Sequence, residues 1–160
     1  MVRMPEKETR LTMEEFHKKI AVGTNNQIWP VLDAENPTEV QLEEALHMAY
    51  ASRYHWSKIG TAVNAVRAEY MIARVYSAMK RGEPALFHAK RCLEIAQENK
   101  NSIEDWDLAF VYEVMARAHS VAGNKTECKR YYDLAQNAIK EIKNPEDKKI
   151  CQGELDKVIC

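Results

Sequence analysis

Residues 73–92, ARVYSAMKRGEPALFHAKRC, align without a gap with residues 116–135, ARAHSVAGNKTECKRYYDLA, at an offset of 43 residues. In both copies, small residues recur at the same places on either side of a short polar turn. Internal repeats with periods of about 20 to 50 residues are typical of stacked helical hairpins, because one hairpin cannot bury its apolar face alone. The aligned pairs are Ala73 and Ala116, Tyr76 and His119, Ala85 and Cys128, Ala89 and Tyr132, and Cys92 and Ala135.

The composition is that of an ordinary globular protein. The chain has 160 residues, 46% hydrophobic and 29% charged, with a formal net charge of −1. We expect one domain over residues 11–160, preceded by a polar, flexible tail over residues 1–10. The pI near 6.5 and the lack of a basic stripe speak against a nucleic-acid partner. Because no apolar run approaches the length of a membrane span and the first residues lack a signal-peptide core, we expect a cytoplasmic protein without membrane contact.

The four cysteines indicate packing rather than chemistry. Cys92 and Cys128 occupy small-residue positions of the repeat, and no two cysteines form a Cys-x-x-Cys pair. We therefore expect buried free thiols that act as small apolar side chains. A disulfide framework is not expected in a chain that has a sizeable core and no export signal, and the spacing disfavours zinc.

Capping signals divide the chain into helices. Thr12 with Glu15 and Thr38 with Gln41 fit the capping box, and Ser102 with Asp105 is a looser version of it. Asn144 before Pro145 is a further N-cap, and Gly82 and Gly123 stand where helices should end. No period-two alternation persists, so no strand is expected. The expected helices span Thr12–Trp29, Thr38–Ser57, Ala62–Arg81, Pro84–Asn99, Ile103–Ala122, Lys125–Ile142 and Pro145–Val158.

The small-residue pattern resembles the tetratricopeptide repeat. A partial third copy lies upstream, where Ala45, Ala49 and Ser52 repeat the spacing of the small residues in the first copy. The family's tryptophan and closing proline are absent from both good copies, and the period of 43 exceeds the usual value of about 34. The resemblance implies an all-α, right-handed stack of about three tetratricopeptide-like hairpins, closed by a C-terminal capping helix. The segment HMAYASRYHW, residues 47–56, is also similar to a group of uncharacterised bacterial proteins.

The resemblance implies a concave groove lined by the first helix of each hairpin, which would hold an extended peptide or a partner helix. Arg74 and Arg117 occupy equivalent positions in successive repeats, so they would stand along one wall. A guanidinium group suits carboxylates, which favours an acidic or C-terminal peptide segment. The alternative for Arg117 is a helix-surface ion pair with Glu113. The candidate binding residues are Arg67, Tyr70, Arg74, Phe110, Glu113 and Arg117.

Histidines and aromatic residues suggest a second candidate. The run Ser52–Trp56 could form a small-molecule pocket from Arg53, His55 and Trp56, although packing at a helix junction is the simpler explanation. Glu44 and His47 form one Glu-x-x-His pair, whereas di-iron bundles need two such pairs. We therefore assign no metal ligand and expect no cofactor.

No nucleophile with a base and no phosphate-binding loop can be assigned, so we expect no enzymatic activity. The sequence favours a non-catalytic protein–protein interaction module with a peptide groove. The alternatives are a homodimeric structural or regulatory protein, and a small-molecule or metal-binding protein that uses the region of His47, His55 and Trp56.

Overall fold

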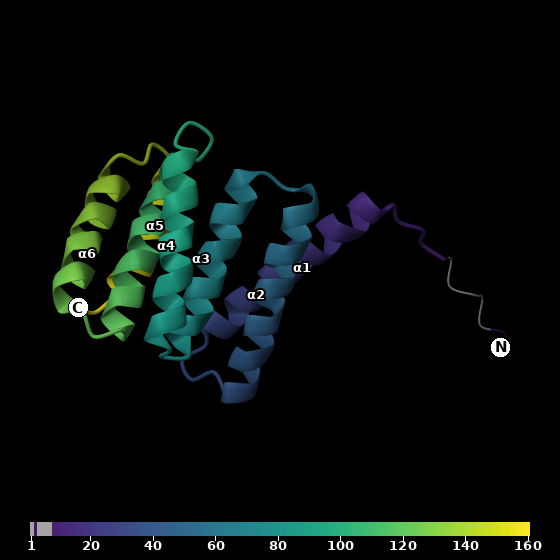
Figure 1. The fold of residues 1–160 in the computed structure, drawn as a ribbon, viewed down its shortest axis with the longest axis horizontal. Coiled ribbons are helices and arrows are strands. Elements are labelled where there is room, and N and C mark those ends of the chain that lie inside the picture. Colours follow the sequence, from purple (N-terminus) through teal and green to yellow (C-terminus); the bar gives the residue numbers. More distant parts are fainter. Residues whose placement is uncertain (1, 3–7) are drawn as a thin grey trace.

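The computed structural model describes residue 2 and residues 8–160, and within this part of the chain the regular structure is entirely helical (Figure 1). The expected all-α class is thereby confirmed. The predicted flexible tail over residues 1–10 falls mostly outside the described residues. The described helices are α1 (Met13–Asp33), α2 (Glu39–Ile59), α3 (Ala62–Ala78), α4 (Gly82–Glu98), α5 (Asp105–Val121), α6 (Lys125–Lys140) and α7 (Pro145–Asp156).

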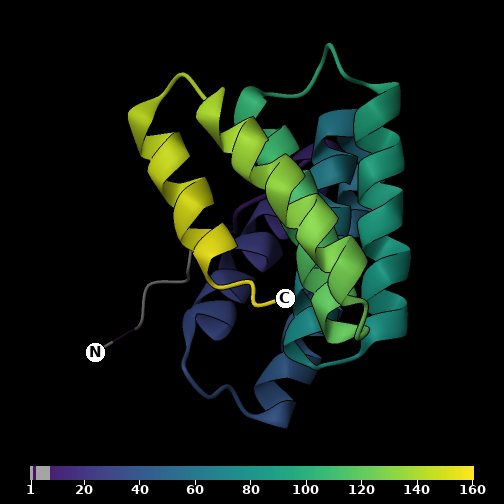
Figure 2. The ribbon, with the colours of Figure 1, turned by 90° about the vertical axis from the view of Figure 1, so that its left-hand side faces the viewer.

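Consecutive helices pack side by side as hairpins, α1 with α2, α3 with α4, and α5 with α6. The first helices of the hairpins also contact one another, because α3 touches both α1 and α5, and α5 touches α7. The end-on view shows α7 on the same side of the molecule as α1, with α4 on the opposite side (Figure 2). A surface formed by α1, α3, α5 and α7 therefore runs along one side of the molecule.

Most of the predicted caps are confirmed. Thr12 and Thr38 each accept a hydrogen bond from the backbone three residues later and complete a capping box. The Asn144 side chain accepts from two backbone N–H groups at the start of α7. The prediction from Ser102 was wrong by two residues, because Glu104 is the N-cap of α5 and its backbone N–H donates to Asp107 at 3.0 Å.

The first helix extends further than its sequence predicts. The expected helix ended at Trp29, but α1 continues to Asp33 with Pro30 inside it. Trp29, Val31 and Leu32 pack against the core. Burial of these side chains outweighs the backbone hydrogen bond that proline removes.

The two glycines predicted to end helices have different roles. Gly123 has φ +81° and follows α5, which is the left-handed position expected of a helix-ending glycine. Gly82 instead opens α4, and Lys80, with φ 57°, adopts the left-handed conformation after α3. A Cβ atom on Gly82 would lie 2.8 Å from Ala122 Cα, so this position requires glycine because two backbones approach closely.

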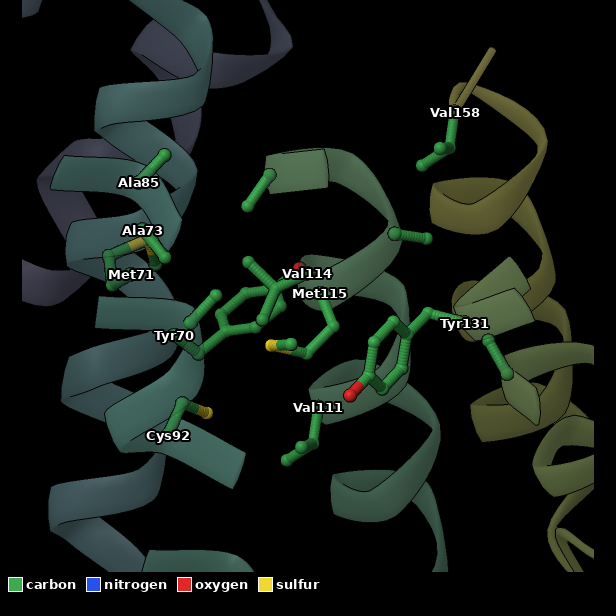
Figure 3. Close-up of a cluster of buried hydrophobic side chains, with 14 of the residues drawn as sticks. Tyr70, Met71, Ala73, Ala85, Cys92, Val111, Val114, Met115, Tyr131 and Val158 are labelled. Atoms are coloured by element: carbon green, nitrogen blue, oxygen red, sulfur yellow. The ribbon is translucent and has the colours of Figure 1, made fainter. Parts of the chain in front are cut away.

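The core follows the repeat. Ala73 of α3 and Ala116 of α5 are completely buried in the core cluster, and most other aligned small residues are buried as well. Tyr132 is an exception, because it is only half-buried whereas its counterpart Ala89 is fully buried. Figure 3 shows part of this cluster, with Tyr70, Met71, Cys92, Val111, Val114, Met115, Tyr131 and Val158 among its labelled side chains.

An aromatic stacking pair recurs in both hairpins with its members exchanged. The Tyr76 ring stacks on His88 at 5.8 Å between centroids, with 18° between the planes. The residues 43 positions later, His119 and Tyr131, stack at 5.6 Å and 9°. The two hairpins therefore keep the geometry of this contact while the tyrosine and the histidine change places.

The cysteine prediction was wrong in one respect. Cys92 and Cys151 are buried free thiols, as expected, and burial raises the pKa of Cys151 to about 12. Cys128, however, forms a disulfide with Cys160. The chain turns back after α7 and brings its last residue to α6, 32 positions away in sequence, a contact that the spacing of the cysteines does not reveal.

None of the helices in the described residues combines the length and hydropathy required to cross a membrane.

Candidate functional site

The candidate binding residues lie on α3 and α5, on the surface that these helices form with α1 and α7. At one end of this surface is a cavity of about 190 Å³ between α1, α3 and α5. We refer to it as the aromatic pocket. Arg67, Tyr70 and Phe110 of the predicted set line it, whereas Arg74, Glu113 and Arg117 lie further along α3 and α5. The residues that line the aromatic pocket are Asn25, Trp29, Val66, Arg67, Tyr70, Met71, Trp106, Asp107, Phe110 and Val111.

Aromatic rings from three helices form the walls of the aromatic pocket. The Tyr70 ring meets Phe110 edge-on at 5.2 Å, and Trp106 meets Phe110 edge-on at 6.1 Å. Trp29 of α1 lies 6.4 Å from Tyr70. These contacts hold the rings in fixed orientations, so the apolar walls exist before any ligand arrives.

Arg67 and Asp107 supply the charged groups of the aromatic pocket. Arg67 donates to Asp107 through Nε at 2.9 Å and Nη2 at 3.0 Å, and its guanidinium lies 4.3 Å from the Trp106 ring. Asp107 is buried, while the Arg67 side chain is 41% exposed. Because both hydrogen bonds to Asp107 use Nε and Nη2, the Nη1 group of Arg67 is free of this pair and can meet a ligand oxygen.

The structure places Arg74 in the interior, which corrects the expectation of an exposed charge. Arg74 is 3% exposed and donates through Nη1 to Tyr70 Oη at 2.7 Å and to Glu154 Oε2 at 2.8 Å. Its guanidinium also lies 5.5 Å from the Trp29 ring. Burial of an unpaired guanidinium would be very unfavourable, and these contacts are what make it tolerable.

Arg117 lies beside Arg74, as their equivalent repeat positions imply. Its Nε donates to Glu113 Oε1 at 2.7 Å, so the predicted helix-surface pair with Glu113 is present, although Glu113 is buried. Arg117 also donates to the backbone oxygen of Glu154 at 3.0 Å and lies 3.7 Å from its carboxylate. The two arginines therefore converge on one residue of α7.

The position of Glu154 beside Arg74 and Arg117 lowers the pKa of its carboxyl group. Burial would raise its pKa, but the charge of Arg74, a hydrogen bond from Lys157 and the charge of Arg117 together hold the pKa below its ordinary value. The carboxylate is therefore ionised at neutral pH and occupies the place that an acidic ligand was expected to take. We refer to Arg74 and Arg117 as the arginine pair.

A second cavity, of about 240 Å³, lies beyond the arginine pair at the ends of α3 and α5. Ser77 and Ser120 line it, together with Leu32 of α1 and the residues after α7. Ser120 Oγ donates to the Ile159 carbonyl at 2.6 Å. The buried Ser77 Oγ has no hydrogen-bond partner among the described residues.

The structure does not bring the polar groups of the second candidate site, Arg53, His55 and Trp56, together. Arg53 Nε donates to Glu69 at 3.0 Å, whereas His55 Nδ1 lies 2.8 Å from His17 Nδ1. Trp56 is half-buried near the end of α2, and His47 is exposed. The polar groups of Arg53 and His55 are thus engaged by different partners on different helices. In the described part of the chain, no three His, Cys, Asp or Glu side chains are grouped so as to hold a metal ion.

A partly buried polar network on the opposite side of α3 was not predicted from the sequence. Glu69, Tyr76 and His88 of this network are buried, whereas Tyr50 is exposed. His88 Nδ1 lies 2.7 Å from Glu69 Oε2, and its Nε2 lies 3.0 Å from Tyr50 Oη, which in turn lies 2.9 Å from Tyr76 Oη. Although the order glutamate, histidine, hydroxyl resembles a catalytic relay, burial and hydrogen bonding raise the pKa of Tyr50, which disfavours a nucleophilic phenolate. We interpret the network as a connection between α2, α3 and α4.

Several residues of the site were also missed. Trp29 and Glu154 come from α1 and α7, which are far apart in sequence from α3 and α5. Trp106 alone carried a local signal, since it stands one turn before Phe110 on the same helix.

Comparison with known proteins gave no match. No family model fits this sequence, and no curated protein and no solved structure is significantly similar to it.

Proposed function

We propose that this protein is a non-catalytic interaction module that binds a peptide segment of another protein. In this proposal the hairpins form a right-handed, tetratricopeptide-like stack, and the surface of α1, α3, α5 and α7 is its concave groove. The observation that carries the proposal is the aromatic pocket, an open apolar cavity with rigid aromatic walls and one partly exposed arginine. Concave, mostly apolar sites with a few polar groups are typical of ligand binding.

The size of the aromatic pocket supports an apolar side chain as the ligand group. An apolar cavity of about 150 Å³ in a protein can hold a benzene molecule. The 190 Å³ available here suits one aromatic or branched aliphatic side chain. Burial of such a side chain contributes roughly 1.5 to 3 kcal/mol.

The polar groups around the aromatic pocket support an adjacent acidic group. Arg67 Nη1 is not used by Asp107, and a carboxylate or a peptide carbonyl could accept its hydrogen bond. Asn25, half-buried in α1, can pair with a peptide backbone group. We therefore propose a ligand with an apolar side chain next to an acidic residue or a C-terminal carboxylate.

Selection from a random peptide library on the intact chain tests this proposal. Enriched peptides should carry an apolar residue next to an acidic group, and Trp106→Ala should weaken their binding by about 2 kcal/mol, or roughly 30-fold. Phe87→Ala is the matched control, because Phe87 is an exposed aromatic side chain on α4, away from the groove. Equal affinity of the parent and Trp106→Ala for every enriched peptide would contradict the proposal, as would the absence of any enrichment.

A homodimer is the second candidate function, and one observation favours it. Leu11, Met13 and Phe16 are exposed at the start of the first hairpin, where none of the described helices covers them. A second copy of the chain could bury them. Light scattering should then give twice the monomer mass, and Phe16→Glu should return the protein to a monomer.

A further inference from the structure

The disulfide encloses α7 in a covalent ring. Cys128 lies in α6, Cys160 ends the segment that follows α7, and the 32 positions between them include the whole of α7. Cys128 is buried, whereas Cys160 is exposed. A thiol in solution can therefore approach the disulfide from the side of Cys160.

Within this ring, α7 and the residues after it cover the arginine pair. Glu154 places its carboxylate between Arg74 and Arg117, and Val158 and Ile159 line the neighbouring cavity of about 240 Å³. Ser77, whose buried Oγ has no hydrogen-bond partner in the described part of the chain, also lines that cavity. The covered region thus offers two guanidinium groups and one unused donor, a set suited to a carboxylate.

We propose that α7 is a removable cover over a carboxylate-binding arginine pair, and that the Cys128–Cys160 disulfide is its redox-sensitive latch. A dithiol reductant attacks Cys160 Sγ through one thiolate and forms a mixed disulfide, while Cys128 leaves as a thiolate and takes up a proton. The second thiol of the reductant then displaces Cys160, which leaves the reductant as a cyclic disulfide and the protein with two thiols.

Without the latch, α7 has few contacts to hold it. It has 12 residues, a length at which isolated helices are marginal in water. Only Cys151 and Leu155 are buried within it, and its remaining ties include the Glu154 ion pairs and a hydrogen bond of 2.7 Å between Gln136 and Gln152. Closing a loop of this length restricts the opened state by a factor on the order of several hundred at most. Reduction should therefore raise the opened fraction of α7 considerably.

The inference rests on the proposed function only for the identity of the ligand. An acidic peptide anchored in the aromatic pocket would extend along α3 and replace Glu154 at the arginine pair. The opening of α7 itself is measurable with no ligand present, so its failure is distinguishable from a failure of peptide binding.

The test combines hydrogen exchange with arginine modification on the full chain. In the oxidised parent, α7 amides should be protected and phenylglyoxal should modify exposed Arg130 but spare Arg74. After reduction with dithiothreitol, α7 amides should exchange about tenfold to a hundredfold faster, and Arg74 should become modified. Cys160→Ser should behave like the reduced parent and should not respond to dithiothreitol, whereas Cys92→Ser should keep the redox response because Cys92 is a free thiol.

If α7 stays protected and Arg74 stays unmodified in both the reduced parent and Cys160→Ser, the disulfide is not a latch. If protection is lost along α1 to α4 to the same extent as in α7, the disulfide supports the whole fold and α7 is not a separate cover.

Discussion

The guanidinium of Arg74 and the carboxylate of Glu154 form an ion pair at 2.8 Å, although 80 residues separate them in sequence. The pair ties the middle of the helical array to its last helix across α5. Because both side chains are largely withdrawn from solvent, this ion pair affects folding as well as any ligand that would compete for Arg74.

Replacement of Arg74 by alanine should destabilise the fold. Glu154 would keep Lys157 and Arg117 as partners, so we expect loss of its charge-assisted hydrogen bond from Arg74 to cost about 1.5 to 3 kcal/mol. Arg130→Ala is the control, since Arg130 forms an exposed pair with Glu127 and should leave the urea midpoint nearly unchanged. If both variants unfold at the same urea concentration, the pair between α3 and α7 does not contribute to stability.

Ala89→Leu should destabilise the protein by about 1 to 3 kcal/mol. Ala89 is completely buried on α4 at a small-residue position of the repeat, so three extra carbon atoms would overpack the contact. Lys90→Leu adds leucine at the next, exposed position of the same helix and should change the melting temperature little. Equal melting of Ala89→Leu and the parent would show that α4 can shift to make room.

Two glycine-to-alanine substitutions should change the stability of the protein in opposite directions. Gly82→Ala should destabilise by more than about 1 kcal/mol, because the new Cβ would lie 2.8 Å from Ala122 Cα. Gly153→Ala should stabilise by about 0.5 to 1 kcal/mol, since no atom lies within 4 Å of its Cβ position and alanine favours the helix. Chemical denaturation of both variants checks the contrast, and a stabilising Gly82→Ala would be inconsistent with the close approach of α4 and Ala122.

The network around Glu69 predicts a pH dependence of stability. Burial would raise the Glu69 pKa, but hydrogen bonds from His88 and Arg53 hold it below the ordinary value of 4.5. A carboxyl group with a lowered folded-state pKa stabilises the fold above its unfolded-state pKa, and this contribution is lost as the pH falls through the folded-state pKa.

The parent should therefore exceed Glu69→Gln in stability most clearly above pH 4.5, and the difference should shrink at lower pH. Urea unfolding from pH 7 to pH 3 measures it, with Glu94→Gln, at an exposed position of α4, as the control. A difference between the parent and Glu69→Gln that stays constant over this range would mean that Glu69 is not held ionised by its neighbours.

The local features of the fold were predictable from the sequence because they depend on neighbouring residues. Thr12, Thr38 and Asn144 cap helices through side chains that reach only two or three residues along the chain. The repeat likewise placed Arg74 beside Arg117, since equivalent positions of successive hairpins become neighbours.

The features of the fold and of the site that the sequence did not predict depend on contacts between segments that are distant in sequence. Arg74 is buried because it contacts Trp29 and Glu154. These two residues lie far from Arg74 in sequence, and no local sequence pattern predicts either contact. The aromatic pocket needs Trp29 and Trp106 from different helices, and the disulfide needs the chain to turn back after α7. Neither the hydrophobic periodicity of the sequence nor its helix-capping residues indicate which distant residues come into contact.

The ring closed by Cys128 and Cys160 also determines how the molecule responds to mechanical tension. A force applied between residue 8 and residue 160 would pass from Cys128 directly to Cys160 through the sulfur atoms, so the chain between them would bear no load. At up to about 3.3 to 3.6 Å per extended residue, roughly 110 Å of contour length stays hidden until the bond is reduced. In a pulling experiment, α1 to α5 could be drawn out completely while the residues between Cys128 and Cys160 stayed free of tension inside the loop.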